Sequence, residues 1–92
     1  MTNSGEKHFV YIIKSQKTGR FYTGLTKNLF RRLQEHEKGR PDASKITHLQ
    51  GPFVLIHAEE CSSYKHAVQR ELFWKSGIGR QIRATICKKL LI

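Results

Sequence analysis

Near the start of the chain, two short apolar runs are separated by a polar turn. Residues 9–13 (FVYII) are rich in β-branched and aromatic side chains, which is typical of a central strand buried on both faces for most of its length. Residues 14–20 contain Gly19, which is free to take a positive φ in a turn. Residues 21–25 (FYTGL) are the returning run, so the pattern predicts an antiparallel hairpin. Gly24 within this run indicates a bulge or a close backbone approach.

A first helix is predicted directly after the hairpin. Asn28 is suited to cap its N-terminus, because an asparagine side-chain oxygen accepts a hydrogen bond from a free backbone N–H. Leu29, Phe30 and Leu33 supply an apolar stripe, and the two leucines are expected to point to the core. Gly39 is suited to end the helix.

A long polar and basic segment follows this helix. Residues 39–52 are bounded by glycine and proline and predict a loop, with room for one helical turn at residues 44–48. A loop of this length in so small a domain is more often functional than decorative. Residues 53–58 (FVLIHA) then predict the third strand.

A second helix is predicted over residues 64–76, with Ser62 or Ser63 as its N-cap. On or near one face of this helix lie Ala67, Val68, Leu72 and Lys75. Phe73 and Trp74 are expected to pack in the core or against a neighbouring helix. This role is commoner for such an aromatic pair than stacking on nucleic-acid bases.

Gly77 and Gly79 are expected to break the second helix before a last one over residues 80–90. This last helix carries apolar residues at spacings of four, namely Ile82, Ile86 and Leu90. The predicted order is therefore β-β-α-β-α-α. A small, mostly antiparallel three-stranded sheet flanked by helices is an α+β fold.

The length and composition narrow the class of protein. Ninety-two residues bury one modest core, so residues 8–92 are expected to form a single domain after a disordered lead-in at residues 1–7. No apolar run approaches the length of a membrane span, and the first residues lack the apolar region of a secretory signal. We therefore expect a cytoplasmic protein. Cys61 and Cys87 have no metal-binding spacing and are expected to be free thiols.

The charge of the chain is strongly positive. Seventeen Lys and Arg residues stand against seven Asp and Glu, which gives a formal net charge of +10. The Lys and Arg residues are spread along the chain and interleaved with aromatic residues. This pattern favours binding to nucleic acid over a high positive charge that serves no polyanionic partner. A membrane surface is the weaker alternative, because no single helix combines a broad apolar face with a basic one.

Five residues are candidates for chemistry on a phosphate. Tyr11 and Tyr22 lie on the two strands of the hairpin and come close across it if they face the same side. Arg32 offers a fork of donors suited to phosphate, and His36, one helical turn on, can transfer a proton. Glu71 can bring a carboxylate to a divalent cation, which in phosphate chemistry takes few protein ligands.

Each candidate also has a structural explanation. Taken singly, the tyrosines are better explained as ordinary strand aromatics, and Arg32 and His36 can belong to a solvated helix edge. Glu71 can pair on the surface with Lys75, four residues later. Periodicity alone therefore goes no further than a basic α+β domain that has candidate residues for a phosphate site.

The spacing of these residues carries a family resemblance. VYI and YTG place two tyrosines eleven residues apart, followed by an Arg ten residues after the second tyrosine and a His four further on. With the later segment HAVQRELFWKSGIGR, this pattern resembles the GIY-YIG nuclease family. Within it, the chain is most similar to small stand-alone proteins related to the N-terminal nuclease domain of the excision-repair subunit UvrC. The resemblance covers residues 8–90.

The resemblance implies a role for each candidate. One of Tyr11 and Tyr22 would activate the attacking water, assisted by the other or by a neighbouring base. Arg32 would stabilise charge on the scissile phosphate, and His36 would help proton transfer. Glu71 would hold one Mg²⁺ or Mn²⁺. The implied function is a metal-dependent endonuclease that hydrolyses DNA phosphodiester bonds, on structured or damaged DNA in repair or recombination.

The alternative to an active enzyme is a nucleic-acid-binding module that has weak catalysis or none and works with a partner protein. The chain departs from the family pattern at Phe9, which stands in place of Gly, and at Thr23, which stands in place of Ile. It also lacks an Asn after Asn28, where many family members carry one beyond the metal-binding helix. Candidates to replace that polar contact are Lys75, Ser76, Thr47 and His48.

Overall fold

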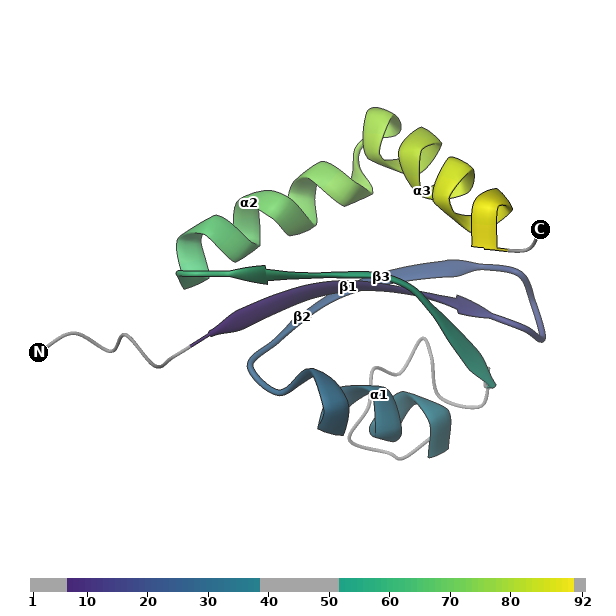
Figure 1. Cartoon of the computed structure of the whole chain (residues 1–92), viewed down its shortest axis with the longest axis horizontal. Coiled ribbons are helices and arrows are strands. Elements are labelled where there is room, and N and C mark those ends of the chain that lie inside the picture. The colour runs from purple at the N-terminus through teal and green to yellow at the C-terminus, as the bar shows by residue number, and fades with distance from the viewer. Residues whose placement is uncertain (1–6, 39–51, 91–92) are drawn as a thin grey trace, which may run out of the picture.

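The computed structural model describes residues 7–38 and 52–90, and it shows a three-stranded sheet with helices on both faces (Figure 1). The elements in chain order are β1 (His8–Ser15), β2 (Phe21–Thr26), α1 (Leu29–Lys38), β3 (Phe53–Cys61), α2 (Tyr64–Lys75) and α3 (Gly77–Leu90). The predicted α+β fold and its β-β-α-β-α-α order are confirmed. The predicted lead-in before residue 7, the loop over residues 39–51, and Thr47 and His48 lie outside the described residues.

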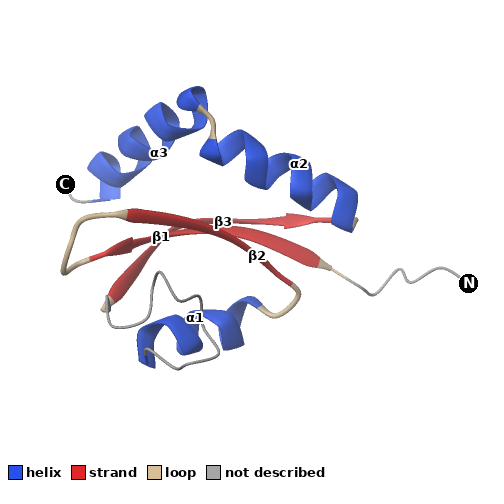
Figure 2. Ribbon diagram, turned by 180° about the vertical axis from the view of Figure 1, so that it is seen from behind, coloured by secondary structure: helices blue, strands red, loops and turns tan. Residues whose placement is uncertain are grey.

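The sheet has the order β2-β1-β3, and both pairings are antiparallel. Its central strand, β1, is the one whose sequence is most continuously apolar, because both of its faces are covered. One face carries α1 and the other carries α2 and α3 (Figures 1 and 2). The pairing of β1 with β3 shifts by one residue between Ile12 and Ile13, whereas the pairing with β2 is regular.

Alternation along β1 divides the interior into two sides. Val10 and Ile12 belong to the main core, on the face covered by α2 and α3. The other buried members of this core are Ile56, Cys61, Ala67, Trp74 and Cys87. Tyr11 and Ile13 point to the opposite face, toward α1, and are also buried. As predicted, both cysteines are free thiols.

The predicted turn and caps are confirmed. Gly19 closes the hairpin with a φ of 79°, a conformation that glycine adopts without steric cost. Asn28 Oδ1 accepts a hydrogen bond of 3.0 Å from the Arg31 N–H, and Ser63 Oγ accepts one of 3.1 Å from the His66 N–H. Each cap satisfies a donor that the first helical turn leaves free.

Two element boundaries differ from the prediction. β3 continues past Ala58 to Cys61, because the N-terminal half of β1 offers it a pairing partner as far as His8. α3 begins at Gly77 rather than at Arg80, so the glycines do not break the chain into loop. The backbone N–H groups of the first helical turn have no acceptor within the helix. One of them, the N–H of Gly79, donates a hydrogen bond of 3.3 Å to Ser76 Oγ.

Several residues predicted to supply apolar stripes are exposed. Phe30 is 72% exposed and Leu72 is 63% exposed, while Leu29 and Leu33 are half-buried. On α2 the buried residues are Ala67 and Trp74, and Leu72 precedes Trp74 by two positions, which places it on the far side of the helix. On α3, Ile82 and Leu90 are also exposed, and Cys87 faces the core instead. Among the described helices, none is long and apolar enough to cross a membrane.

Candidate active site

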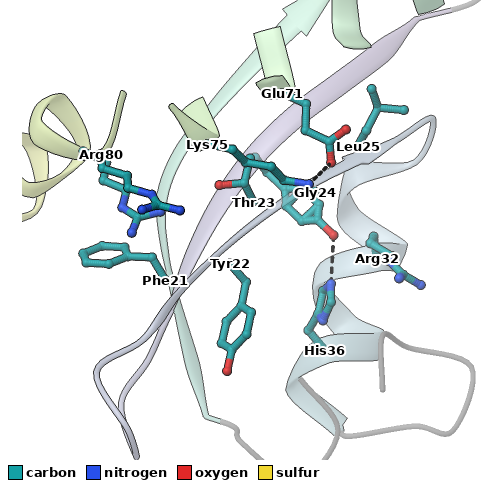
Figure 3. A pocket seen from close by; sticks show the side chains of 12 residues that line it. Phe21, Tyr22, Thr23, Gly24, Leu25, Arg32, His36, Glu71, Lys75 and Arg80 are labelled. Atoms are coloured by element: carbon teal, nitrogen blue, oxygen red, sulfur yellow. Dashed lines mark hydrogen bonds and ion pairs between the residues drawn. The ribbon is translucent and has the colours of Figure 1, made fainter. Parts of the chain in front are cut away.

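A pocket of about 500 Å³ lies along β2, one of the two edge strands of the described sheet, and we call it the edge pocket. Its lining includes all five predicted site residues, which are Tyr11, Tyr22, Arg32, His36 and Glu71. Figure 3 shows Arg32 and His36 reaching it from α1 and Glu71 from α2. Residues from both faces of the sheet therefore meet in the edge pocket at β2, which has no strand on its outer side among the described elements.

Gly24 allows Tyr11 to reach this edge. The two residues are paired directly across β1 and β2, and the tyrosine ring lies over the glycine. A Cβ atom at Gly24 would stand 2.3 Å from the Tyr11 hydroxyl oxygen and 2.4 Å from Cζ, far inside van der Waals contact. The predicted bulge is not present at Gly24, because the pairing of β1 and β2 is regular there, and the close approach is made by the Tyr11 side chain and not by another backbone segment.

Replacing Gly24 by alanine is expected to destabilise the fold by about 1–3 kcal/mol, because the Tyr11 ring must leave its site to make room for the methyl group. Urea unfolding at neutral pH measures this loss. Gly77→Ala is the matched control, because a Cβ at Gly77 meets nothing within 4 Å. Equal stability of the two variants would contradict the close packing of Tyr11 on Gly24.

Tyr11 and His36 form the buried centre of the site. The tyrosine hydroxyl oxygen and His36 Nε2 lie 2.8 Å apart, and the two residues are 3% exposed each. Burial raises the pKa of Tyr11; a hydrogen bond and the charge of Arg32 oppose this shift, and the carboxylates of Glu71 and Glu35 add to it. Burial also lowers the pKa of His36, as does the charge of Arg32. Both groups are therefore neutral near pH 7, and a neutral imidazole can accept a proton.

Arg32 lies between this pair and an acidic residue that the sequence reasoning missed. Its Nη1 atom is 3.0 Å from Glu35 Oε1, and its side chain is 27% exposed. It also interacts with the Tyr11 hydroxyl. Glu35 bonds to Arg31 as well, at 3.5 Å. A carboxylate three residues after Arg32 on the same helix is a recognisable ion-pair spacing, so the signal was present in the sequence.

Tyr22 shares a face with Tyr11 but lies further along the sheet. It pairs with Ile13, two residues beyond Tyr11, so the two tyrosines are diagonal neighbours. Its ring centroid is 6.0 Å from that of Phe53, and the Phe53 centroid is 5.9 Å from that of His36. Phe53 therefore connects Tyr22 to the other residues of this face.

Glu71 enters the edge pocket from the opposite face and is paired with Lys75. The Lys75 Nζ atom lies 3.3 Å from Glu71 Oε2, so the surface-type ion pair considered from the sequence is present (Figure 3). The Glu71 side chain is 24% exposed, and its charge acts on Tyr11. Glu71 is therefore electrostatically part of the site although it lies far from the tyrosines in sequence.

The donor set suits a hydrated divalent cation. Within residues 7–38 and 52–90, no three His, Cys, Asp or Glu side chains are grouped so that they could hold a metal ion. Glu71 alone would be the protein ligand, and Mg²⁺ is commonly held by one or two carboxylates with several retained waters. Thr23 also lines the edge pocket, and its buried Oγ1 atom has no hydrogen-bond partner in the described structure. A carboxylate and an unsatisfied hydroxyl together fit a metal with a water shell.

A separate hydrogen-bond network fixes α2, the helix that carries Glu71. The carboxylate of Glu59 on β3 accepts two hydrogen bonds from Arg70, at 2.5 and 3.2 Å. It accepts a third from Trp74 Nε1, at 3.2 Å, and it also lies 2.9 Å from His57 Nε2. Burial by itself raises the pKa of Glu59, but the bonds from Arg70, His57 and Trp74 outweigh it and hold the pKa at about 2. The network anchors α2 on both sides of Glu71.

Replacing Glu59 by glutamine is expected to cost about 1–3 kcal/mol of stability, because Arg70 loses its charged partner in a half-buried site. The pKa of Glu59 is lowered on folding, so its contribution is complete above 4.5 and is lost as the pH falls toward 2. Urea unfolding should therefore show a gap between wild type and variant at neutral pH that closes toward pH 2. A gap that does not change with pH would contradict this assignment.

The edge pocket also contains residues for which the sequence analysis made no site prediction. They include Phe21 at the start of β2, and Arg80 and Arg83 on α3. Arg80 and Arg83 are three residues apart and therefore share a helix face, which was the available signal. Their position beside β2 depends on how α3 packs, and periodicity does not determine that.

Comparisons with known proteins identify the family of the chain. The model of the GIY-YIG catalytic domain matches residues 7–81. Two UPF0213 proteins are similar to the chain. The one from Oceanobacillus iheyensis is 38% identical, and the match covers 72% of this chain and 73% of that protein. The one from Syntrophus aciditrophicus is 42% identical, and the match covers 71% of this chain and 72% of that protein. The solution NMR structure of a UPF0213 protein from Bacillus halodurans has a TM-score of 0.52 and 29% identity, and covers 87% of this chain and 84% of that one. The chain therefore belongs to the GIY-YIG catalytic domain family.

Proposed function

We propose that this protein is a metal-dependent endonuclease that hydrolyses DNA phosphodiester bonds. The family supports a nuclease-type function. The observation that carries the proposal is the convergence of a buried Tyr11 and His36 pair, Arg32 and Glu71 on one pocket at the sheet edge. A general base, a guanidinium and a carboxylate are the groups that phosphodiester hydrolysis needs.

The chemistry starts from the neutral pair. Tyr11 gives its hydroxyl proton to Nε2 of His36, and the tyrosine oxygen takes a proton from a water molecule. The resulting hydroxide forms a bond to phosphorus as the bond from phosphorus to the 3′ oxygen breaks. The 3′ oxygen keeps the electron pair and takes a proton from solvent, and His36 returns its proton to solvent. The raised pKa of Tyr11 makes its anion a strong base, and the lowered pKa of His36 keeps the imidazole free to accept.

Arg32 and Glu71 handle the charge of this reaction. Arg32 binds a non-bridging phosphate oxygen, where negative charge accumulates, and leaves part of its contact with Glu35 to do so. Glu71 would hold the divalent cation, Mg²⁺ or Mn²⁺, and the cation would supply positive charge to offset the negative charge that develops in the reaction. Lys75, which lines the pocket, would give up its contact with Glu71 when the carboxylate holds a cation, and it would take the polar role that Asn has in other family members. We assign Tyr22 to orienting the attacking water.

The test is cleavage of supercoiled plasmid and of nicked and branched DNA, with Mg²⁺, Mn²⁺ or EDTA. We expect products only with a divalent metal, and faster cleavage of branched or nicked DNA if the protein acts in repair or recombination. Absence of cleavage of every substrate with either metal would overturn the proposal.

The second candidate is a nucleic-acid-binding module that works with a partner protein. The ion pair between Lys75 and Glu71 favours it, because an ammonium group already neutralises the carboxylate that would hold the metal. This candidate predicts salt-dependent DNA binding without cleavage. In either case we take residues 8–92 as a single domain that acts in the cytoplasm.

A further inference from the structure

One half of the edge pocket has no part in the proposed chemistry. Figure 3 shows Arg80 beside Phe21 on one side of the pocket, and Arg32 with His36 on the other. Arg83 lines the same half, one helical turn from Arg80 on α3. The two halves are joined along β2, from Phe21 at its start to Gly24.

The Arg83 side chain is held in place by an aromatic ring. Its guanidinium carbon lies 4.4 Å from the centroid of Phe21, and the residue is half-buried. An arginine stacked on a ring loses little freedom, because the planar group is already oriented. Burial lowers the pKa of Arg83, as does the neighbouring positive charge of Arg80.

Arg80 and Arg83 carry like charges into a shared pocket. Of the carboxylates in the described residues, none forms an ion pair with either arginine. Bringing two guanidinium groups together without an acid costs free energy, and an anion bound between them would recover it. The other described basic residues near the sheet edge differ, since Arg32 and Lys75 each have an acidic partner.

We propose that Arg80 and Arg83 bind the backbone phosphate of the nucleotide adjacent to the scissile phosphodiester, so that the nucleic-acid strand runs along β2. Phe21 is a positioning residue that orients Arg83 toward this phosphate. The inference rests on the proposed function for the identity of the ligand. Arg80 and Arg83 lie in the same pocket as the Glu71 carboxylate, and neither has an acidic partner among the described residues. This arrangement is the same whether or not the site cleaves nucleic acid.

The test is binding of fluorescein-labelled single- and double-stranded oligonucleotides in EDTA, followed by anisotropy over a range of salt concentrations. The variant Arg80→Ala/Arg83→Ala is compared with Lys88→Ala/Lys89→Ala, which removes the same charge from exposed positions of α3 outside the pocket. We expect the pocket variant to bind at least about tenfold more weakly and to lower the magnitude of the salt slope by about 1. The control should change affinity by less than about threefold.

Two further variants separate position from charge. Arg80→Lys/Arg83→Lys keeps the charge and the fold but loses the guanidinium fork, so an intermediate loss of affinity is expected. Phe21→Leu keeps both arginines and should still weaken binding, because Arg83 loses its platform. Circular dichroism and thermal unfolding verify that each variant is folded.

The outcomes distinguish this inference from the proposed function. If both double-alanine variants lose affinity equally, the binding is a general effect of charge and the inference is overturned. It is also overturned if the pocket variant binds as tightly as wild type. If wild type binds but cuts no substrate, the proposed function fails while the phosphate site is still tested by the same titrations.

Discussion

Replacing Glu71 by glutamine is expected to reduce cleavage by about 10²–10³-fold or more, the scale on which removal of one charge-stabilising group from an active site acts. Glutamine has the same shape but no charge, and a divalent cation held by a single side chain depends on that charge. The change should cost little stability, because the ion pair with Lys75 is partly exposed and such pairs contribute about 0–1 kcal/mol.

The measurement is the single-turnover cleavage rate, paired with Mn²⁺ binding followed by electron paramagnetic resonance. The second readout does not depend on catalysis and should show loss of bound Mn²⁺ in the variant. Glu60→Gln is the matched control, because this carboxylate on β3 is exposed and pairs with Lys7 at 3.4 Å, outside the edge pocket. Equal cleavage by wild type and the Glu71 variant would contradict the assignment of Glu71 to the active site. If every preparation cleaved at the same rate, a contaminating nuclease would be the explanation.

Replacing Tyr11 by phenylalanine is expected to reduce the cleavage rate by about 10²–10⁴-fold, the usual contribution of a general base. Phenylalanine keeps the ring that packs on Gly24 but removes the oxygen that lies 2.8 Å from His36 Nε2. The variant should also be less stable by about 1–3 kcal/mol, because the buried imidazole loses a hydrogen-bond partner.

The control for Tyr11→Phe is Tyr64→Phe, since Tyr64 is 61% exposed on α2 and is not in the pocket. Tyr22→Phe, measured in parallel, decides which tyrosine is the base. If Tyr11→Phe retains activity and Tyr22→Phe does not, the assignment of roles is reversed. Rates of all three variants should be compared at equal metal concentration.

The pH dependence follows from the same pair. Because the pKa of His36 is lowered, its acceptor form persists below the ordinary histidine value of 6.5. Cleavage by wild type should therefore stay constant as the pH falls to about 6.5 and decline only at lower pH, where His36 becomes protonated. Folding stability should decline over the same range, because the unfolded chain binds the proton more tightly than the folded one. An acid limb that begins above 6.5 would contradict this.

Much of the fold was readable from local pattern. Tyr11 lies in a run whose β-branched neighbours indicate a central strand, and Asn28 and Ser63 are capping residues whose effect is confined to one helical turn. The errors arose where a residue's environment depends on distant elements. Phe30 and Leu72 were assigned to apolar faces by their spacing, but burial depends on which side of a helix meets the sheet, and here Trp74 occupies that side of α2.

The sequence by itself determined the hairpin with its two tyrosines, the i, i+4 spacing of Arg32 and His36, and the motif that indicates the family, because these signals are local or have fixed spacing. Only the tertiary structure decided how they meet. It placed Tyr11 across Gly24 and against His36, and it brought Glu71 into the same pocket as these residues. It also brought Arg83 onto Phe21, more than sixty residues away in the chain. These contacts depend on how α1, α2 and α3 pack on the sheet, and on the space that Gly24 leaves for the Tyr11 ring. Periodicity within one segment carries no information about that packing.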